Sequence, residues 1–163
     1  MLEVPNLLAS CSVQYALRAV KDHPLQKFSD IIDQDMVALF LSLAKEREVF
    51  GRPIGKNQGI QFPLAESFAK LETAELMVQK AASLYDRGQQ CGKEANIAKY
   101  MAAEAACEAA DRAIQTHGGY GYIKEYDVER YWREARLFRI APISQEMVLN
   151  YIGEHVLGLP KSY

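Results

Sequence analysis

The sequence has little excess of one charge over the other. Its 163 residues include 19 Lys and Arg against 21 Asp and Glu, which leaves a net charge of −2. A protein that binds nucleic acid through its phosphates needs a strongly basic surface, and this balance does not supply one. The sequence also lacks a run of about 18 apolar residues that could cross a bilayer. We therefore expect no nucleic-acid partner and no membrane span.

Cysteine and histidine are scarce as well. The three cysteines, an odd number without the spacing of metal ligands, are Cys11, Cys91 and Cys107. They fit a reduced, cytoplasmic protein, and the opening residues lack the basic segment of a signal peptide. The residues three positions before His23, His117 and His155 are all aliphatic, which excludes the Glu-x-x-His pairs of a di-iron bundle. No Cys-x-x-Cys motif occurs either, so we expect no metal site, and neither a P-loop nor a Gly-x-Ser-x-Gly motif is present.

The remaining composition is typical of one globular domain. Hydrophobic residues make up 49% of the chain and charged residues 25%. A chain of this length buries roughly 70% of its unfolded surface, enough for one core. We expect residues 1–30 to form an irregular N-terminal segment with one short helix that Pro24 ends, and residues 31–163 to form the domain.

Apolar residues recur at steps of three and four over most of the chain, which predicts α-helices. We expect helices over about 29–48, 63–87, 93–117, 126–138 and 144–157. The apolar stripe of the second consists of Leu64, Phe68, Leu71, Ala74, Val78, Ala81 and Tyr85. The third carries nine alanines, which favour helix and let neighbouring helices approach closely. Two long helices joined by a short turn predict an all-α fold, an antiparallel up-down helical bundle.

Two glycine-rich breaks interrupt the helices, at 50–60 and 118–122, and the first is expected to have no regular structure. Glycines let a backbone approach a ligand closely, and helix N-termini present free N–H groups to anions. Together with Arg47, these segments are suited to a phosphate or pyrophosphate. The alternative is that Gly118 only ends a helix and the other residues form ordinary turns.

Three motifs occur in order along the chain: R-x-x-F-G at 47–51, Q-x-x-G-G-x-G at 115–121 and E-R-x-x-R-E-A-R at 129–136. In this combination the chain, from about residue 38 to its end, resembles the C-terminal helical domain of acyl-CoA dehydrogenases. These are FAD enzymes that desaturate acyl-CoA thioesters in fatty acid metabolism. The resemblance implies the same helical bundle and an oxidoreductase function that depends on FAD.

The resemblance also implies which residues contact FAD. In the family, the first motif and a following glutamine contact FAD bound mainly by a neighbouring subunit, and the second motif lies against the ADP portion. A later Gly-Thr-x-Glu segment also contacts the cofactor, and Ser144 and Glu146 stand at its threonine and glutamate positions. The cofactor-binding residues implied in this way are Arg47, Phe50, Gln58, Gln115, Gly118, Gly119, Ser144 and Glu146.

The catalytic base is missing from its most common position. The family reaction needs a carboxylate that abstracts the α-proton of the thioester. It usually stands two residues before the threonine of Gly-Thr-x-Glu, which is Pro142 in this chain. Other members carry the base about seven helical turns before the first arginine, which points to Asp22 as a weak candidate. The catalytic residue is therefore unassigned.

The resemblance implies partners too. The family's C-terminal domain builds a dimer of dimers, so we expect a homo-oligomer, either a dimer or a tetramer. A complete member binds acyl-CoA and has a β-rich domain that covers the flavin, for which 163 residues leave no room. We expect the isolated chain to be inactive without a partner chain that carries the missing domains. The alternative function is a non-catalytic helical module, derived from this domain, for oligomerisation or interaction.

Several other residues have two interpretations. His117 either contacts the cofactor or is an ordinary helix-end histidine. The acidic residues at 125–129 either form a metal or acid–base cluster or complement the dipole of the next helix. The arginines of that helix, at 130, 133 and 136, are expected to be ion-paired groups at a surface or interface. We expect Trp132 to be a core or interface anchor.

Overall fold

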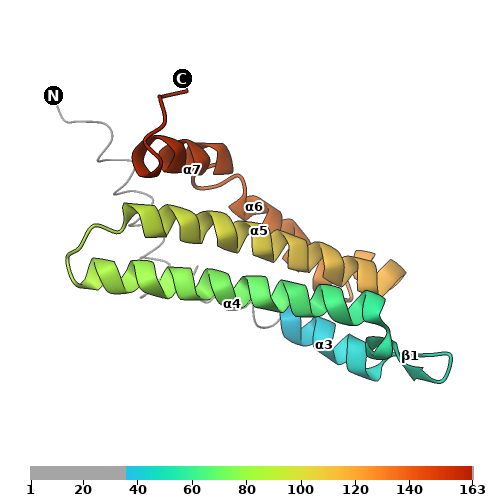
Figure 1. Ribbon diagram of the computed structural model, residues 1–163. Helices are drawn as coiled ribbons and strands as arrows, with labels where there is room; N and C mark the ends of the chain where they lie inside the picture. The colour runs from blue at the N-terminus through green and yellow to red at the C-terminus, as the bar shows by residue number, and fades with distance from the viewer. Residues whose placement is uncertain (1–35, 163) are drawn as a thin grey trace.

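The computed structural model describes residues 36–162, and the expectations for 1–30, including Asp22, lie outside them. In this part of the chain five α-helices alternate with short connecting elements (Figure 1). The order is α3 Met36–Glu46, β1 Glu48–Val49, β2 Arg52–Pro53, η2 Ile54–Lys56, α4 Gln58–Asp86, α5 Gly92–His117, η3 Gly118–Tyr122, α6 Val128–Phe138, α7 Gln145–Tyr151 and η4 Ile152–Val156. Here η2 and η3 are 3₁₀ turns and η4 is a π turn. The predicted all-α bundle is confirmed.

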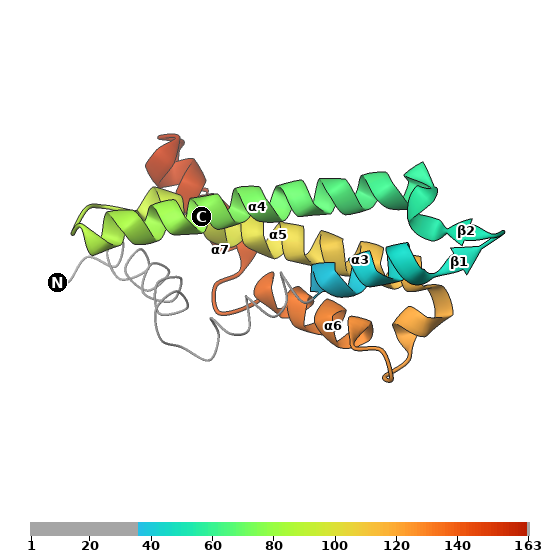
Figure 2. The same cartoon turned by 90° about the horizontal axis from the view of Figure 1, so that it is seen from below.

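The helix α5 is the central element of the bundle. It runs antiparallel to α4 along its whole length and also contacts α3, α6 and α7. Figure 2 shows α3 and α6 beside α5, with α7 at the opposite end of the molecule from β1 and β2. This arrangement puts the segments after α3 and after α5 at one end and the start of α7 beside the middle of α5, where Gln145 bonds Glu104.

Small side chains on α5 make this packing possible. The alanines of α5 that are buried are Ala95, Ala98, Ala103, Ala105, Ala106, Ala109, Ala110 and Ala113. Larger side chains from the neighbouring helices, such as Met36, Leu71 and Tyr131, fill the space beside them. Because alanine adds so little bulk, four helices can approach α5 closely.

The first glycine-rich break is more regular than predicted. Residues 48–53 form a two-stranded antiparallel ribbon in which Val49 pairs with Arg52. The helix α4 starts at Gln58, five residues before the expected start at Pro63, and proline lies inside the helix. The expectation treated proline as a start signal. In the structure its fixed φ is compatible with a helix that has already begun.

The predicted stripe on α4 is only partly buried. Leu71, Ala74 and Ala81 are in the core, but Phe68 is 51% exposed and Tyr85 is also exposed. The apolar stripe is therefore not continuous in the core, because these two positions lie in solvent. A helix packed mainly against one neighbour buries a narrow line of residues, and the edges of the apolar stripe stay in solvent.

Candidate functional site

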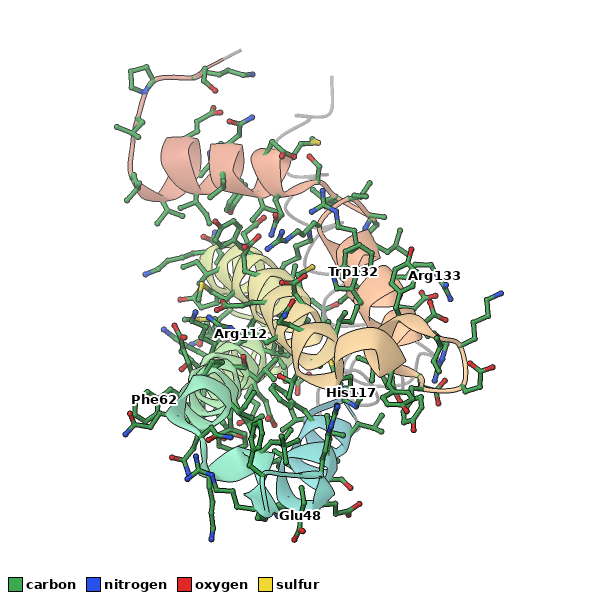
Figure 3. All side chains as sticks on the ribbon, turned by 90° about the vertical axis from the view of Figure 1, so that its right-hand side faces the viewer. Glu48, Phe62, Arg112, His117, Trp132 and Arg133 are labelled. Atoms are coloured by element: carbon green, nitrogen blue, oxygen red, sulfur yellow. The ribbon has the colours of Figure 1, made fainter. Side chains whose placement is uncertain are left out.

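The two glycine-rich segments meet at one end of the bundle. Arg47 directly follows α3, and its Nη1 donates a hydrogen bond of 3.2 Å to the backbone carbonyl of His117, the last residue of α5. The two residues are 70 positions apart in the chain. We call this end, formed by residues 47–60 and 115–122, the glycine-loop end. Figure 3 looks onto it, with Glu48 and His117 labelled.

Arg47 is held in place while most of its donors stay available. A guanidinium has five N–H donors. Among residues 36–162 the only acceptor for the Arg47 guanidinium is the carbonyl of His117, and the side chain is exposed. The contact therefore orients the guanidinium and leaves N–H groups that can bind an anion such as a phosphate.

The side chain of His117 belongs to the core rather than to an open site. It is 2% exposed, and its Nδ1 lies 2.7 Å from the carbonyl oxygen of Ala113. Because that oxygen can only accept, Nδ1 carries the proton. The ring also makes an edge contact with Tyr126 at 6.2 Å between centroids. This arrangement agrees with a helix-end histidine whose backbone carbonyl, not its imidazole, meets the site.

Phe50 has an unusual place at the tip of the ribbon. Its φ is +54° and that of Gly51 is +74°, so both central residues of the turn are left-handed. A side chain other than glycine, asparagine or aspartate pays about 1–2 kcal/mol for this backbone. The Phe50 ring is also 98% exposed. Since the ring packs on nothing within residues 36–162, its apolar surface is available to another molecule.

Gln58 opens the helix α4 at the same end of the molecule. The preceding Asn57 does not cap the helix with its side chain, which instead donates to the carbonyl of Ile54 at 3.1 Å and accepts from Arg52 at 2.8 Å. The N–H groups of Gln58 and Gly59 have no acceptor in the described part of the chain. The positive end of the α4 dipole is therefore open to solvent beside an exposed glutamine.

The glycines of these segments have different roles. A Cβ on Gly55 would lie 2.7 Å from the carbonyl oxygen of Ala44, and one on Gly121 would lie 2.7 Å from that of Ile114, so both are required for packing. Gly118 has φ +62°, which explains it by turn geometry. Gly59 and Gly119 have neither reason, since a Cβ added to either would have no neighbouring atom within 4 Å. The surface at these two glycines is open.

Gln115 completes this group of six predicted residues. It is exposed one helical turn from the end of α5, next to exposed Gly118 and Gly119. The structure thus brings together the predicted residues Arg47, Phe50, Gln58, Gln115, Gly118 and Gly119.

Ser144 and Glu146 lie elsewhere, at the start of α7. Ser144 precedes the helix and Glu146 is in its first turn. The backbone N–H of Glu146 and then the Ser144 hydroxyl lower the pKa of the Glu146 carboxyl. The adjacent Gln145 bonds to Glu104 of α5. Glu104 lies roughly 20 Å from His117 along the axis of α5, so the predicted residues fall into two separate groups.

The loop between α6 and α7 carries no exposed carboxylate at the expected base position. Pro142 is exposed there, and the loop is joined to α5 by side chains that the sequence interpretation did not single out. Lys99 donates to the carbonyl of Phe138 at 2.6 Å, and Glu104 accepts from Arg139 at 2.6 Å. These partners are 39 and 35 positions apart, so no local pattern could have revealed them.

The charged residues at 125–136 behave as surface groups. Arg130 pairs with Asp127 at 3.0 Å and Arg133 with Glu129 at 2.9 Å, which confirms the expected ion pairs for these two arginines. Trp132 is 44% exposed, so it is not a core anchor. Within residues 36–162, no group of three or more His, Cys, Asp and Glu side chains is arranged to hold a metal ion. None of the helices in that range is both long and apolar enough to cross a bilayer.

Comparisons with known proteins agree with this arrangement. The family model described as acyl-CoA dehydrogenase, C-terminal domain, matches residues 33–157. An acyl-CoA dehydrogenase of Mycobacterium tuberculosis is 53% identical over 121 residues, which are 73% of this chain and 31% of that protein. The chain thus spans about a third of the length of the curated relatives that it matches.

Two solved structures extend the comparison. Glutaryl-coenzyme A dehydrogenase in complex with glutaryl-CoA superposes with a TM-score of 0.83 and 28% identity, covering 96% of this chain and 38% of that one. PigA with FAD and proline superposes with a TM-score of 0.76 and 26% identity, covering 81% and 35%. Fold, motifs and family match agree, and the chain belongs to the acyl-CoA dehydrogenase family, in which it corresponds to the C-terminal helical domain.

Proposed function

We propose that this chain acts as the C-terminal domain of an FAD-dependent acyl-CoA dehydrogenase, where it contributes contacts to FAD and to the oligomer interface. The reaction of such an enzyme is the α,β-desaturation of an acyl-CoA thioester. The observation that carries the proposal is the Arg47–His117 contact, which joins the two glycine-rich segments into one surface. A relative with the same fold has been solved with FAD.

The residues at the glycine-loop end fit the chemistry of FAD. The cofactor combines a pyrophosphate with flavin and adenine rings, so it needs both anion donors and apolar contacts. Arg47 and the open N–H groups of Gln58 and Gly59 supply the donors. Phe50 supplies an exposed ring, and Gly119 leaves room for close approach to the backbone. When bound, FAD would accept the hydride that leaves the β-carbon of the thioester.

We assign the ADP portion to the end of α5. Gln115, Gly118 and Gly119 are exposed and contiguous there. The positive φ of Gly118 turns the chain away from the helix, so that Gly119 stands clear of neighbouring atoms. A dinucleotide can therefore approach the backbone at Gly119 without displacing a neighbouring side chain of residues 36–162.

The second group, Ser144 and Glu146, is assigned to a different FAD molecule or a distant part of the same one. It lies near Glu104, roughly 20 Å along α5 from the glycine-loop end. An oligomer in which neighbouring subunits share the cofactor brings such separated groups onto one ligand. This geometry supports the proposal of a homo-oligomer, a dimer or a tetramer.

The exposed face of α4 is the surface we assign to subunit association. It carries a stripe of apolar side chains at helical spacing, namely Phe62, Ala65, Ala69 and Leu76. Phe62 is 58% exposed and Leu76 is 65% exposed. The two alanines between them allow a partner helix to approach closely. Light scattering should give a mass above the monomer, and Leu76→Glu should lower it, while Glu72→Gln beside the stripe should not.

The test of cofactor binding is a titration of the purified chain with FAD, followed by flavin fluorescence. We expect saturable binding that ADP competes with and FMN does not, because the assigned contacts are to the ADP portion. Arg47→Ala should weaken binding by at least about ten-fold. Arg52→Ala is the matched control, since Arg52 already bonds Asn57. Absence of FAD and ADP binding at about 1 mM, where affinity corresponds to some 4 kcal/mol, would contradict the proposal.

A second candidate is a non-catalytic helical module for oligomerisation. One observation favours it: the expected base position is Pro142, and the neighbouring carboxylate of Glu104 is engaged by Arg139 and Gln145. The two candidates differ in their cofactor. An oligomer that takes up neither FAD nor ADP would favour the module over the dehydrogenase domain.

The location we propose for the protein is the cytoplasm. The two cysteines of the described part, Cys91 and Cys107, are both free thiols, and burial raises the pKa of each. Free, largely protonated thiols of this kind persist in a reducing compartment. Fractionation of cells that express a tagged chain tests this assignment, and recovery in a membrane or extracellular fraction would contradict it.

A further inference from the structure

The loop from α6 to α7 is attached to α5 at both of its ends. Residues 139–144 form this loop, with Arg139 as its first residue and Gln145 opening α7 directly after it. Glu104 of α5 accepts one hydrogen bond from each: Oε2 from Nη2 of Arg139 at 2.6 Å and Oε1 from Nε2 of Gln145 at 2.7 Å. The two oxygens of one carboxylate therefore join the two ends of the loop.

Other contacts close the same loop. The backbone N–H of Gln145 donates to the carbonyl of Arg139 at 3.3 Å. Nζ of Lys99 donates to the carbonyl of Phe138 at 2.6 Å, at the end of α6 where no N–H of that helix can reach it. A cation at a helix C-terminus also stabilises the helix dipole. Lys99 therefore fixes the end of α6, and Glu104 fixes the loop that begins directly after it.

Arg139 depends on this carboxylate. Its Nε is buried without a hydrogen-bond partner in the described part of the chain, and Glu104 is its ion-pair partner. Removal of the carboxylate would leave a partly buried guanidinium unpaired, which is more costly than the loss of a surface ion pair. The loop would then have to rearrange to return Arg139 to solvent.

We propose that Glu104 is a positioning residue that clamps the α6–α7 loop onto α5 and thereby places Ser144 and Glu146 for contact with FAD. The second half rests on the proposed function, and the first does not. The hydrogen bonds of Glu104 go to Arg139 and Gln145. The carboxylate thus acts on the two FAD-contacting positions through Gln145, which lies between them in the chain.

Glu108 provides a matched control. It is one turn further along α5 and also accepts hydrogen bonds from two side chains, in this case the cations Lys70 at 2.7 Å and Arg112 at 2.7 Å. Its side chain is 31% exposed, against 37% for Glu104. Its partners lie on α4 and on α5 itself, away from the loop. Glu104→Gln and Glu108→Gln thus remove the same charge from the same helix, with and without a connection to residues 139–145.

The experiment measures amide hydrogen exchange and FAD affinity in the full chain. Glu104→Gln should speed exchange in residues 139–147 about ten-fold and weaken FAD binding by a similar factor, because an amide keeps only one acceptor for two donors. Glu108→Gln should leave both unchanged, although it lowers the unfolding temperature. Glu104→Asp retains the charge and should show a smaller loss than Glu104→Gln.

The outcomes test the clamp and the proposed FAD function separately. Equal exchange of residues 139–147 in the two Gln variants would overturn the clamp. Faster exchange with unchanged FAD affinity would overturn its role in placing Ser144 and Glu146. If the wild type takes up no flavin, the proposed function fails, and the exchange comparison still decides whether Glu104 holds the loop. If Glu104→Gln is too unstable to purify, Gln145→Ala removes one of the two hydrogen bonds to Glu104. Its hydrogen exchange and FAD affinity are then compared with those of Glu108→Gln.

Discussion

Replacement of Gly121 by alanine tests how tightly η3 is packed onto the end of α5. An added Cβ would lie 2.7 Å from the carbonyl oxygen of Ile114, 3.0 Å from its Cα and 3.0 Å from the Cβ of His117. Two of these three atoms are backbone atoms of α5, which cannot rotate away. The strain must therefore move η3 or the last turn of α5.

The expected cost follows from the size of this overlap. Forcing one methyl group into a packed site costs about 1–3 kcal/mol. For a domain of this size, each kcal/mol lowers the midpoint of thermal unfolding by about 2–4 °C. Gly121→Ala should thus lower Tm by roughly 2–12 °C, with the larger values expected if the buried ring of His117 is also displaced.

Gly119→Ala is the matched control, two residues away in the same turn. Nothing lies within 4 Å of its added Cβ, so the folded state should tolerate the methyl group. Alanine also restricts the unfolded chain, which should raise stability by about 0.4–1 kcal/mol. At the same time the methyl group covers backbone that we assign to the ADP portion, so FAD affinity should fall.

Thermal unfolding and a flavin titration of the two variants measure these effects together. We expect Gly121→Ala to lower Tm and Gly119→Ala to raise Tm slightly but bind FAD less tightly. Equal Tm values for both variants would refute the packing argument. An unchanged FAD affinity in Gly119→Ala would refute the assignment of this glycine to the cofactor, whatever happens to stability.

Three further substitutions test other contacts. Phe50→Asn should raise the free energy of unfolding by about 1 kcal/mol in a urea titration while FAD affinity falls, because asparagine tolerates φ +54° and the exposed ring loses no packing. Gly118→Ala should lower stability by about 1 kcal/mol, since φ +62° disfavours alanine, and an unchanged Tm would contradict this. Hydrogen bonds from Lys70 and then Arg112 lower the pKa of the Glu108 carboxyl below its ordinary 4.5. The ionised carboxylate therefore stabilises the fold fully above pH 4.5, and this contribution is lost as the pH falls through the pKa of the folded state. The stability difference between wild type and Glu108→Gln, measured in urea from pH 7 to pH 3, should therefore shrink towards acid, and a constant difference would contradict the ion-pair argument.

The helices were predictable where local signals agree. The helix α5 was expected over 93–117 and starts only one residue earlier, because its alanines favour helix and Gly118 ends it. The start of α4 was missed because Pro63 resembles a first-turn proline, although the helix begins at Gln58. The ribbon was missed because a left-handed phenylalanine at position 50 goes against every turn preference.

The residues of the candidate site remain a prediction from motifs, and their arrangement in space had no signal in the sequence. The resemblance supplied Arg47 and Gln115 by motif, and only the fold shows that the segments around them meet across 70 positions. No pattern in the sequence pointed to the contacts of Glu104 with the α6–α7 loop. A glutamate in an alanine-rich helix is expected on a solvated face, and its partners are 35 and 41 residues away.

The glycine-loop end gathers features that the described part of the chain does not need for its own packing. Phe50 holds an exposed ring on a strained backbone, and Arg47 carries more donors than residues 36–162 use. Gly119 costs backbone conformational entropy on folding, with no neighbour in the described part of the chain that requires a glycine. Sequences depart from local folding rules mainly where a function compensates for the loss. Each of these departures, taken alone, also occurs in other proteins for structural reasons. Three of them at one end of the bundle therefore support a ligand there more strongly than any one motif does.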